Sequence, residues 1–142
     1  MRVLLFIFMV VGCVSIGHTQ DVELDTALRK NESVYEFYMP YFGAESDVDM
    51  NYQYKLEEMA LWLQRDTTIH LHIRGHVCCG EGWRLSRLRA HRVYRFLLDK
   101  GAPPERLSYK GYSNSCPKRW PERTEEDENL NRRVDFVIRK LR

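Results

Sequence analysis

The segment from Ile69 to Lys100 most constrains how this chain can fold. It opens with apolar residues at every second position, a pattern typical of a strand with one buried face: Ile69, Leu71 and Ile73. After a short loop, apolar residues recur at helical spacing from about Arg84 to Lys100: Leu85, Leu88, Val93, Phe96 and Leu97. Gly101 and Pro103-Pro104 indicate the end of this helix. We therefore predict a strand followed by a helix that packs on its buried face.

Similar patterns predict the remaining elements. An aromatic-rich strand is expected within 33–42, ended by Pro40, and a helix is expected to carry Tyr52, Leu56, Met59, Ala60 and Leu63. A third strand over 106–111, a short helix with a capping box at Thr124 and a final strand over 134–139 complete the order. Two helices must then cover one face of one sheet. The predicted fold class is an α/β (α+β) two-layer sandwich, ordered β-α-β-α-β-(short α)-β around a mixed sheet.

Residues 1–20 have the features of a secretory signal peptide. A basic start at Arg2 precedes an apolar run over 3–11, which is too short to span a bilayer as a helix. We expect a polar tether over 21–32 and one domain over 33–142. An alternative also fits, because Val10-Val11-Gly12-Cys13 looks like a lipobox in which Cys13 would be lipidated and would anchor the chain to a membrane.

Four motifs together give the chain a family resemblance. They are Gly75-His76, Leu85-Ser86 with Arg89-Ala90, Gly111 followed by Pro117, and Asn131-Arg132-Arg133-Val134. In this order and spacing they resemble the OmpA-like domain family over about residues 34–141. The resemblance implies a non-catalytic module that binds peptidoglycan in the periplasm, at the outer membrane of a Gram-negative-type bacterium. Its expected ligand is the diaminopimelate of the peptide stem.

The resemblance also implies the site residues. Arg89 matches the arginine that binds the diaminopimelate carboxylate, and a guanidinium binds a carboxylate through two parallel hydrogen bonds. Cys78 stands where the family has the aspartate that pairs with the ligand's ammonium group, so a thiolate at Cys78 would be a partial replacement. Glu81 is a second candidate for that negative charge. The same resemblance places Gly75, His76, Arg132 and Arg133 at the pocket, with Asn131 positioning the turn.

Each of these residues also has a simpler interpretation. Arg89 belongs to a run of basic residues on a predicted helix, and Glu81 fits a solvated loop. Arg132 and Arg133 would be charged residues at a strand edge, where charge limits aggregation. Gly75 would simply provide a backbone conformation that residues with a side chain rarely adopt.

Cysteine count leaves the redox state open. Removal of residues 1–20 would leave Cys78, Cys79 and Cys116, and export to an oxidising compartment permits a disulfide. Because adjacent cysteines rarely bridge each other, we expect Cys116 to pair with Cys78 or Cys79. A zinc or redox site formed by these cysteines and nearby histidines is an alternative, but the chain has no Cys-x-x-Cys pair. We therefore expect no metal and no cofactor.

Charge and motifs narrow the class of function. Basic and acidic residues nearly balance, at 22 and 20, which argues against nucleic acid as a partner. The chain has no nucleophile-elbow, zinc-protease or phosphate-loop motif, so we do not expect an enzyme. The expected partners are peptidoglycan and an outer-membrane protein. The alternative is a structural or interaction module whose altered pocket binds a protein partner or another ligand.

Overall fold

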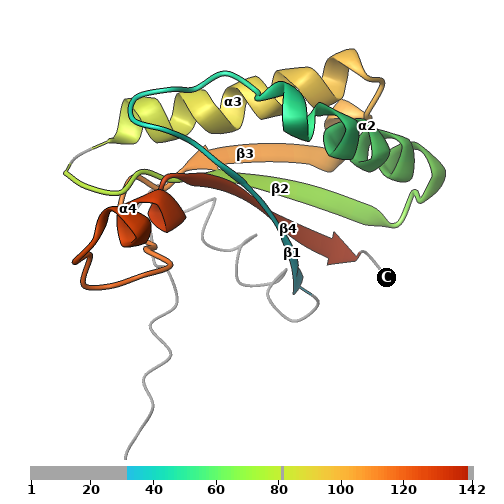
Figure 1. Ribbon diagram of the computed structural model, residues 1–142. Coiled ribbons are helices and arrows are strands. Elements are labelled where there is room, and N and C mark those ends of the chain that lie inside the picture. Colours follow the sequence, from blue (N-terminus) through green and yellow to red (C-terminus); the bar gives the residue numbers. More distant parts are fainter. Residues whose placement is uncertain (1–31, 81, 141–142) are drawn as a thin grey trace, which may run out of the picture.

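The computed structural model describes residues 32–80 and 82–140, which form two layers (Figure 1). The expected signal peptide, Cys13, nearly all of the tether and Glu81 lie outside these residues. The elements in chain order are β1 (Glu32–Pro40), α2 (Met50–Arg65), β2 (Ile69–Gly75), α3 (Trp83–Asp99), the 3-10 turn η2 (Pro104–Arg106), β3 (Leu107–Gly111), α4 (Glu125–Asn131) and β4 (Arg133–Lys140). This is the predicted order of strands and helices.

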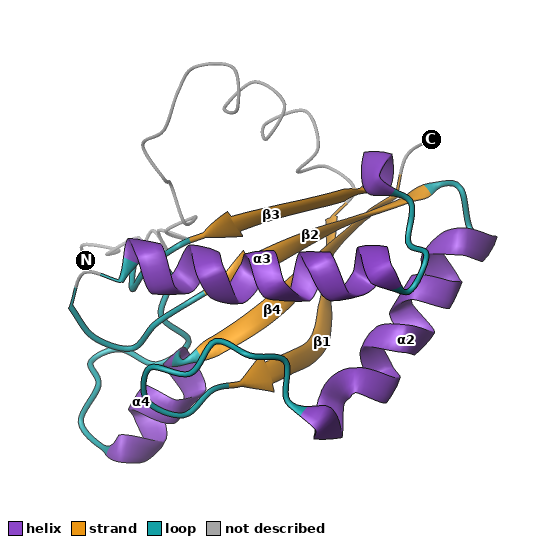
Figure 2. Cartoon of the chain, turned by 90° about the horizontal axis from the view of Figure 1, so that it is seen from above, coloured by secondary structure: helices purple, strands orange, loops and turns teal. Residues whose placement is uncertain are grey.

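The four strands form one mixed sheet in the order β1-β4-β2-β3. β4 is antiparallel to both of its neighbours, whereas β2 and β3 are parallel. Helices α2 and α3 cover one face of the sheet, and α4 lies at the end of the sheet where α3 begins (Figures 1 and 2). The predicted two-layer sandwich is therefore confirmed.

The core lies between the sheet and the two long helices. Alternate residues of β2 and β4 meet the apolar stripes of α2 and α3 there: Leu71, Ile73, Val134, Phe136, Leu56, Leu63, Val93 and Leu97. Burying one such side chain stabilises the fold by about 1.5–3 kcal/mol. The periodic patterns in the sequence therefore reflect which face of each element is buried.

Local signals end the elements as expected. Asp49 is the N-cap of α2 and accepts a hydrogen bond from the Asn51 amide at 2.8 Å. Gly101 follows α3 with a positive φ of 87°. Thr124 and Asp127 form the predicted capping box of α4. β1 is an edge strand that ends at Pro40, where a missing amide donor does not interrupt the sheet.

Gly75 has a different role from the one expected. It has no positive φ. Instead, a Cβ atom at Gly75 would lie 1.9 Å from the Ser86 carbonyl oxygen, and one at Gly111 would lie 2.5 Å from the Arg87 amide nitrogen. The ends of β2 and β3 thus lack side chains because the first turns of α3 pack directly on them. Among the described residues, no helix is both long and apolar enough to cross a membrane.

Candidate ligand-binding pocket

A pocket of about 540 Å³ lies where β2 ends and α3 begins. Its walls come from the loop after β1, the loop after β2, the first turns of α3 and the residue before β4. Three arginines line it: Arg84, Arg89 and Arg132. The volume falls within the range of about 300–1,000 Å³ that is usual for small-molecule sites. The pocket is thus large enough for an amino-acid or short peptide end and has a cationic lining.

Arg89 forms the buried part of this lining. Arg89 lies on α3, and the residue has an exposed fraction of 0%. Its guanidinium donates three hydrogen bonds to main-chain carbonyls, to Glu45 at 2.7 Å, to His76 at 2.9 Å and to Gly43 at 2.8 Å. Arg89 therefore ties the loop after β1 to the end of β2. A guanidinium has five N–H donors, so two of them form no hydrogen bond within the part of the chain that the structure describes.

Among residues 32–80 and 82–140, no side chain forms an ion pair with the Arg89 guanidinium. Its guanidinium carbon lies 4.7 Å from the centre of the Tyr41 ring, which stabilises a cation through the face of the ring. No carboxylate among the described residues lies within ion-pair distance of it. Burial lowers the pKa of Arg89 to about 10, so it stays charged at neutral pH. A buried and unpaired cation at a pocket favours the approach of an anion.

Two serines hold the pocket walls in place. The Ser86 hydroxyl, fully buried in α3, donates to the Trp83 carbonyl and accepts from the Ser113 amide, both at 3.1 Å. Ser113 accepts in turn from the Gly82 amide at 2.9 Å, and its own carbonyl accepts from the Val77 amide at 3.0 Å. These bonds link the loops after β2 and β3 to the start of α3.

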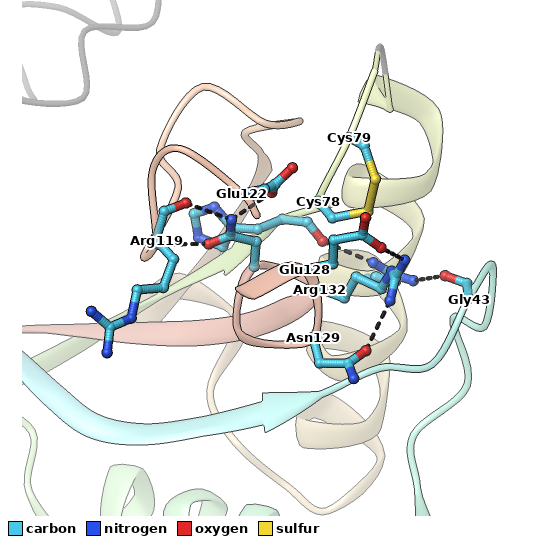
Figure 3. The surroundings of a disulfide bond; sticks show 11 residues. Gly43, Cys78, Cys79, Arg119, Glu122, Glu128, Asn129 and Arg132 are labelled. Atoms are coloured by element: carbon cyan, nitrogen blue, oxygen red, sulfur yellow. Dashed lines mark hydrogen bonds and ion pairs between the residues drawn. A yellow bond between two sulfur atoms is a disulfide. The ribbon is translucent and has the colours of Figure 1, made fainter. Parts of the chain in front are cut away.

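Cys78 and Cys79 are bonded to each other at the pocket (Figure 3). The expected pairing of either one with Cys116 is therefore wrong. The tight loop over 76–80 brings the adjacent sulfur atoms together, which a rule based on sequence separation did not anticipate. A disulfide has no ionisable thiol, so Cys78 cannot provide the expected thiolate.

Arg132 lies at the pocket beside the disulfide (Figure 3). Its guanidinium donates to Glu128 Oε2 at 2.5 Å and to Asn129 Oδ1 at 2.8 Å, both on α4. α4 thus holds Arg132, one of the two C-terminal arginines expected at the pocket, in the pocket lining.

Arg133 and the His76 imidazole lie on the other face of the sheet. Arg133 Nε donates to Asp135 Oδ2 at 2.9 Å, and His76 Nε2 lies 3.3 Å from the same oxygen. Arg74 Nε donates to Asp135 Oδ1 at 2.5 Å. Arg133, which was expected to bind ligand, is therefore not among the residues that line this pocket, because residues 133 and 135 face away from their apolar neighbours Val134 and Phe136. His76 contributes to the pocket side only through its carbonyl.

Asn131 organises the long loop before α4, as expected. Its fully buried amide accepts from the Lys118 and Arg119 amides at 2.6 and 3.0 Å. It donates to the Arg119 carbonyl at 2.9 Å and to Glu122 Oε1 at 2.5 Å. One side chain thereby satisfies four polar groups of the loop, next to the arginine that reaches the pocket.

Within the part of the chain that the structure describes, one group of residues has metal-ligand spacing. The sulfur atoms of Cys78 and Cys79 and a carboxylate oxygen of Glu128 lie within 4.8 Å of one another. Both sulfurs are committed to the disulfide, and the group contains none of the histidines considered above. This geometry does not favour the zinc alternative.

Comparison with known families adds to this geometry. A model of the OmpA family matches residues 41–132, more than half of the chain. The chain belongs to the OmpA family. The expected resemblance is thereby confirmed, and the matched region contains the pocket-lining loop after β1, the start of α3 and Arg132.

Solved structures share the OmpA fold of this chain. The C-terminal domain of Helicobacter pylori MotB matches with a TM-score of 0.67 and 22% identity, covering 73% of this chain and 84% of that one. The peptidoglycan-associated lipoprotein of Burkholderia pseudomallei matches with a TM-score of 0.63 and 23% identity, covering 78% and 92%. A putative MotB-like protein of Desulfovibrio vulgaris matches with a TM-score of 0.65 and 18% identity, covering 85% and 88%. No curated protein was found to match the chain in sequence.

Several pocket contacts of this OmpA-family chain were missed from its sequence. The carbonyls of Gly43 and Glu45 bind Arg89, and main-chain groups carry no sequence signal. Ser86 belongs to a sequence motif that does not reveal its hydrogen bonds, and no sequence pattern joins it to Ser113. Glu128 was also missed, although its position four residues before Arg132 on a predicted helix suggests an ion pair.

Proposed function

We propose that this OmpA-family chain binds the peptide stem of peptidoglycan without catalysis, through a carboxylate of diaminopimelate. The observation that carries the proposal is Arg89, a buried guanidinium at the pocket with two donors left over and no ion-pair partner among the described residues. An incoming carboxylate would supply the missing counter-charge. Charge-assisted hydrogen bonds of this kind are about twice as strong as neutral ones.

Two further features support an anionic ligand. Arg84 and Arg132 line the same pocket, which raises its positive potential. The N-terminus of α3 begins at Trp83, a pocket residue, and its main-chain amides favour negative charge. The solved relative from Burkholderia pseudomallei is described as peptidoglycan-associated, which is consistent with a cell-wall ligand.

The proposed place of action is the periplasm, close to the outer membrane. Residues 1–20 would direct export, and residues 21–32 would tether the domain. Attachment to the outer membrane would come from lipid at Cys13, from an outer-membrane protein or from the wall itself. The domain would then link the cell envelope to peptidoglycan.

A second candidate is a domain whose altered pocket binds a protein partner or another ligand. The Cys78–Cys79 disulfide favours it, because a neutral group occupies the position of the family's aspartate. The three carbonyl bonds of Arg89 also serve a structural purpose in the absence of any ligand.

Calorimetric titration with a soluble diaminopimelate-containing stem peptide tests the proposal. Arg89→Lys keeps a positive charge but loses the forked geometry, so we expect affinity to fall about tenfold or more. Arg95→Gln, at a mostly exposed arginine of the same helix, is the matched control and should leave affinity unchanged. Melting curves must show that both variants are folded. Absence of binding by the wild-type chain, or equal binding by a folded Arg89→Lys variant, contradicts the proposal, and the former favours the second candidate.

A further inference from the structure

Glu128 brings an acidic group to the side of the pocket where the family's aspartate is missing. One of its carboxylate oxygens and the sulfur atoms of Cys78 and Cys79 all lie within 4.8 Å of one another. Figure 3 shows the carboxylate below the disulfide and beside the guanidinium of Arg132. Glu128 comes from α4, whereas the family's aspartate would come from the loop after β2. An acid from a different element thus lies beside Cys78, the residue that stands at the position of the family's aspartate.

The Glu128 carboxylate has room for another partner. Its Oε2 atom accepts from Arg132, while Oε1 has no hydrogen bond among the residues that the structure describes. The Glu128 side chain is 38% exposed, so a ligand can reach it. A carboxylate has about four acceptor positions. An ammonium group can therefore bind to Glu128 without displacing Arg132.

The ion pair between Glu128 and Arg132 does not prevent this. Partly exposed pairs contribute little net stability, since water competes for both charges. The guanidinium of Arg132, which lines the pocket, also contacts Asn129 on the same helix, and this second contact holds the ion pair beside the disulfide. The pair therefore positions the acid for a ligand.

Glu45, a second acid near the pocket among the described residues, is placed differently. Glu45 is exposed, and its main-chain carbonyl accepts from Arg89 Nε. Its charge acts on the Arg89 guanidinium, so it lies at the carboxylate end of the expected ligand. Glu128 is the acid beside the disulfide, which is the ammonium end.

We infer that Glu128 replaces the family's aspartate and gives the pocket its selectivity for a zwitterionic amino-acid end. Arg89 binds the carboxylate of that end, and Glu128 accepts from its ammonium group. The disulfide is a neutral part of the pocket lining beside Glu128. The ligand class is an amino-acid terminus that carries both charges, such as the free end of diaminopimelate in a peptide stem. This inference rests on the proposed function.

The test compares two synthetic stem peptides by calorimetric titration of the full chain. One contains diaminopimelate, and the other contains 2-aminopimelate, which lacks only the side-chain ammonium. We expect the wild-type chain to bind the first about tenfold more tightly, as is typical of a charge-assisted contact. Glu128→Gln should bind both peptides with nearly equal affinity.

Two variants serve as controls. Glu126→Gln removes the same charge from an exposed position of α4 and should keep the wild-type preference. Glu45→Gln should also keep it. Loss of the preference in Glu45→Gln but not in Glu128→Gln overturns the inference and assigns the ammonium end to Glu45.

The two proposals fail in different ways. A wild-type chain that binds neither peptide overturns the proposed function and this inference with it. A wild-type chain that binds both peptides equally overturns the inference alone, because carboxylate binding remains. Retention of the preference in a folded Glu128→Gln variant also overturns only the inference.

Discussion

The Cα of Gly75 packs so closely on the main chain of Ser86 that an added methyl group would lie 1.9 Å from the Ser86 carbonyl oxygen. This contact brings the first turns of α3 onto the end of β2. Arg89 follows Ser86 by about one helical turn, so the same contact sets the depth at which the guanidinium meets the carbonyls of Gly43, Glu45 and His76. The missing side chain at position 75 therefore matters for the pocket as well as for packing.

We expect Gly75→Ala to destabilise the domain by about 3 kcal/mol or more, since neither main-chain segment can move away without disturbing the core. The comparison is Gly80→Ala, at a glycine with a positive φ of 64° and open space around its Cα. That change should cost only about 1 kcal/mol, the strain of a left-handed alanine. Urea unfolding measures both. Equal destabilisation by the two substitutions would show that the close approach is not the reason for glycine at position 75.

The fold was predictable because burial leaves periodic traces in the sequence. Ile69, Leu71 and Ile73 alternate because every second side chain of β2 enters the core, and the stripe of α3 reflects the same requirement at helical spacing. The capping box at Thr124 was also predictable, since a capping side chain bonds to main-chain groups only a few residues away.

The pocket was predictable only in part. Arg89, Cys78 and Arg132 line it as expected. The position of Arg133 outside the pocket lining has a signal in the sequence, since the apolar residues Val134 and Phe136 assign their odd-numbered neighbours to the opposite face of the sheet. The contact between Glu128 and the disulfide had no local signal, because 49 or more residues separate these positions and only the tertiary fold joins them.

The disulfide predicts a specific peptide mass. Trypsin cleaves after Arg74 and Arg84, so Cys78 and Cys79 leave in one peptide over 75–84. Without reductant, this peptide should appear alone, lighter by two hydrogen atoms and unreactive toward alkylating agents. After reduction it should take up two alkyl groups. Mass spectrometry of the unreduced digest makes the measurement, and a cross-link between this peptide and the one containing Cys116 would instead support the pairing expected from the sequence.

Acid should weaken the domain in two separate steps, because of His76 and Asp135 on the face of the sheet opposite the helices. Burial lowers the pKa of His76, although Asp135 opposes this effect. A buried histidine that prefers to be neutral contributes stability above its ordinary pKa of about 6.5, and this contribution is lost as the pH falls below that value. Burial alone would raise the pKa of Asp135, but the neighbouring His76 imidazole and the charges of Arg74 and Arg133 outweigh it and hold that pKa well below its usual range.

The contribution of Asp135 to the free energy of unfolding is therefore complete only well above pH 3.8, the ordinary pKa of the group, and is lost progressively as the pH falls below about 5. Urea unfolding at pH 7, 5 and 3 should show one decrease between the first two values and a second between the last two. His76→Gln should remove most of the first decrease, and His70, whose pKa burial also lowers, should account for the remainder. Asp135→Asn should flatten the second decrease and cost about 3 kcal/mol or more at pH 7, since it leaves the buried Arg133 without its carboxylate. An unchanged stability difference between pH 5 and pH 3 in Asp135→Asn would show that other carboxylates cause the loss in acid.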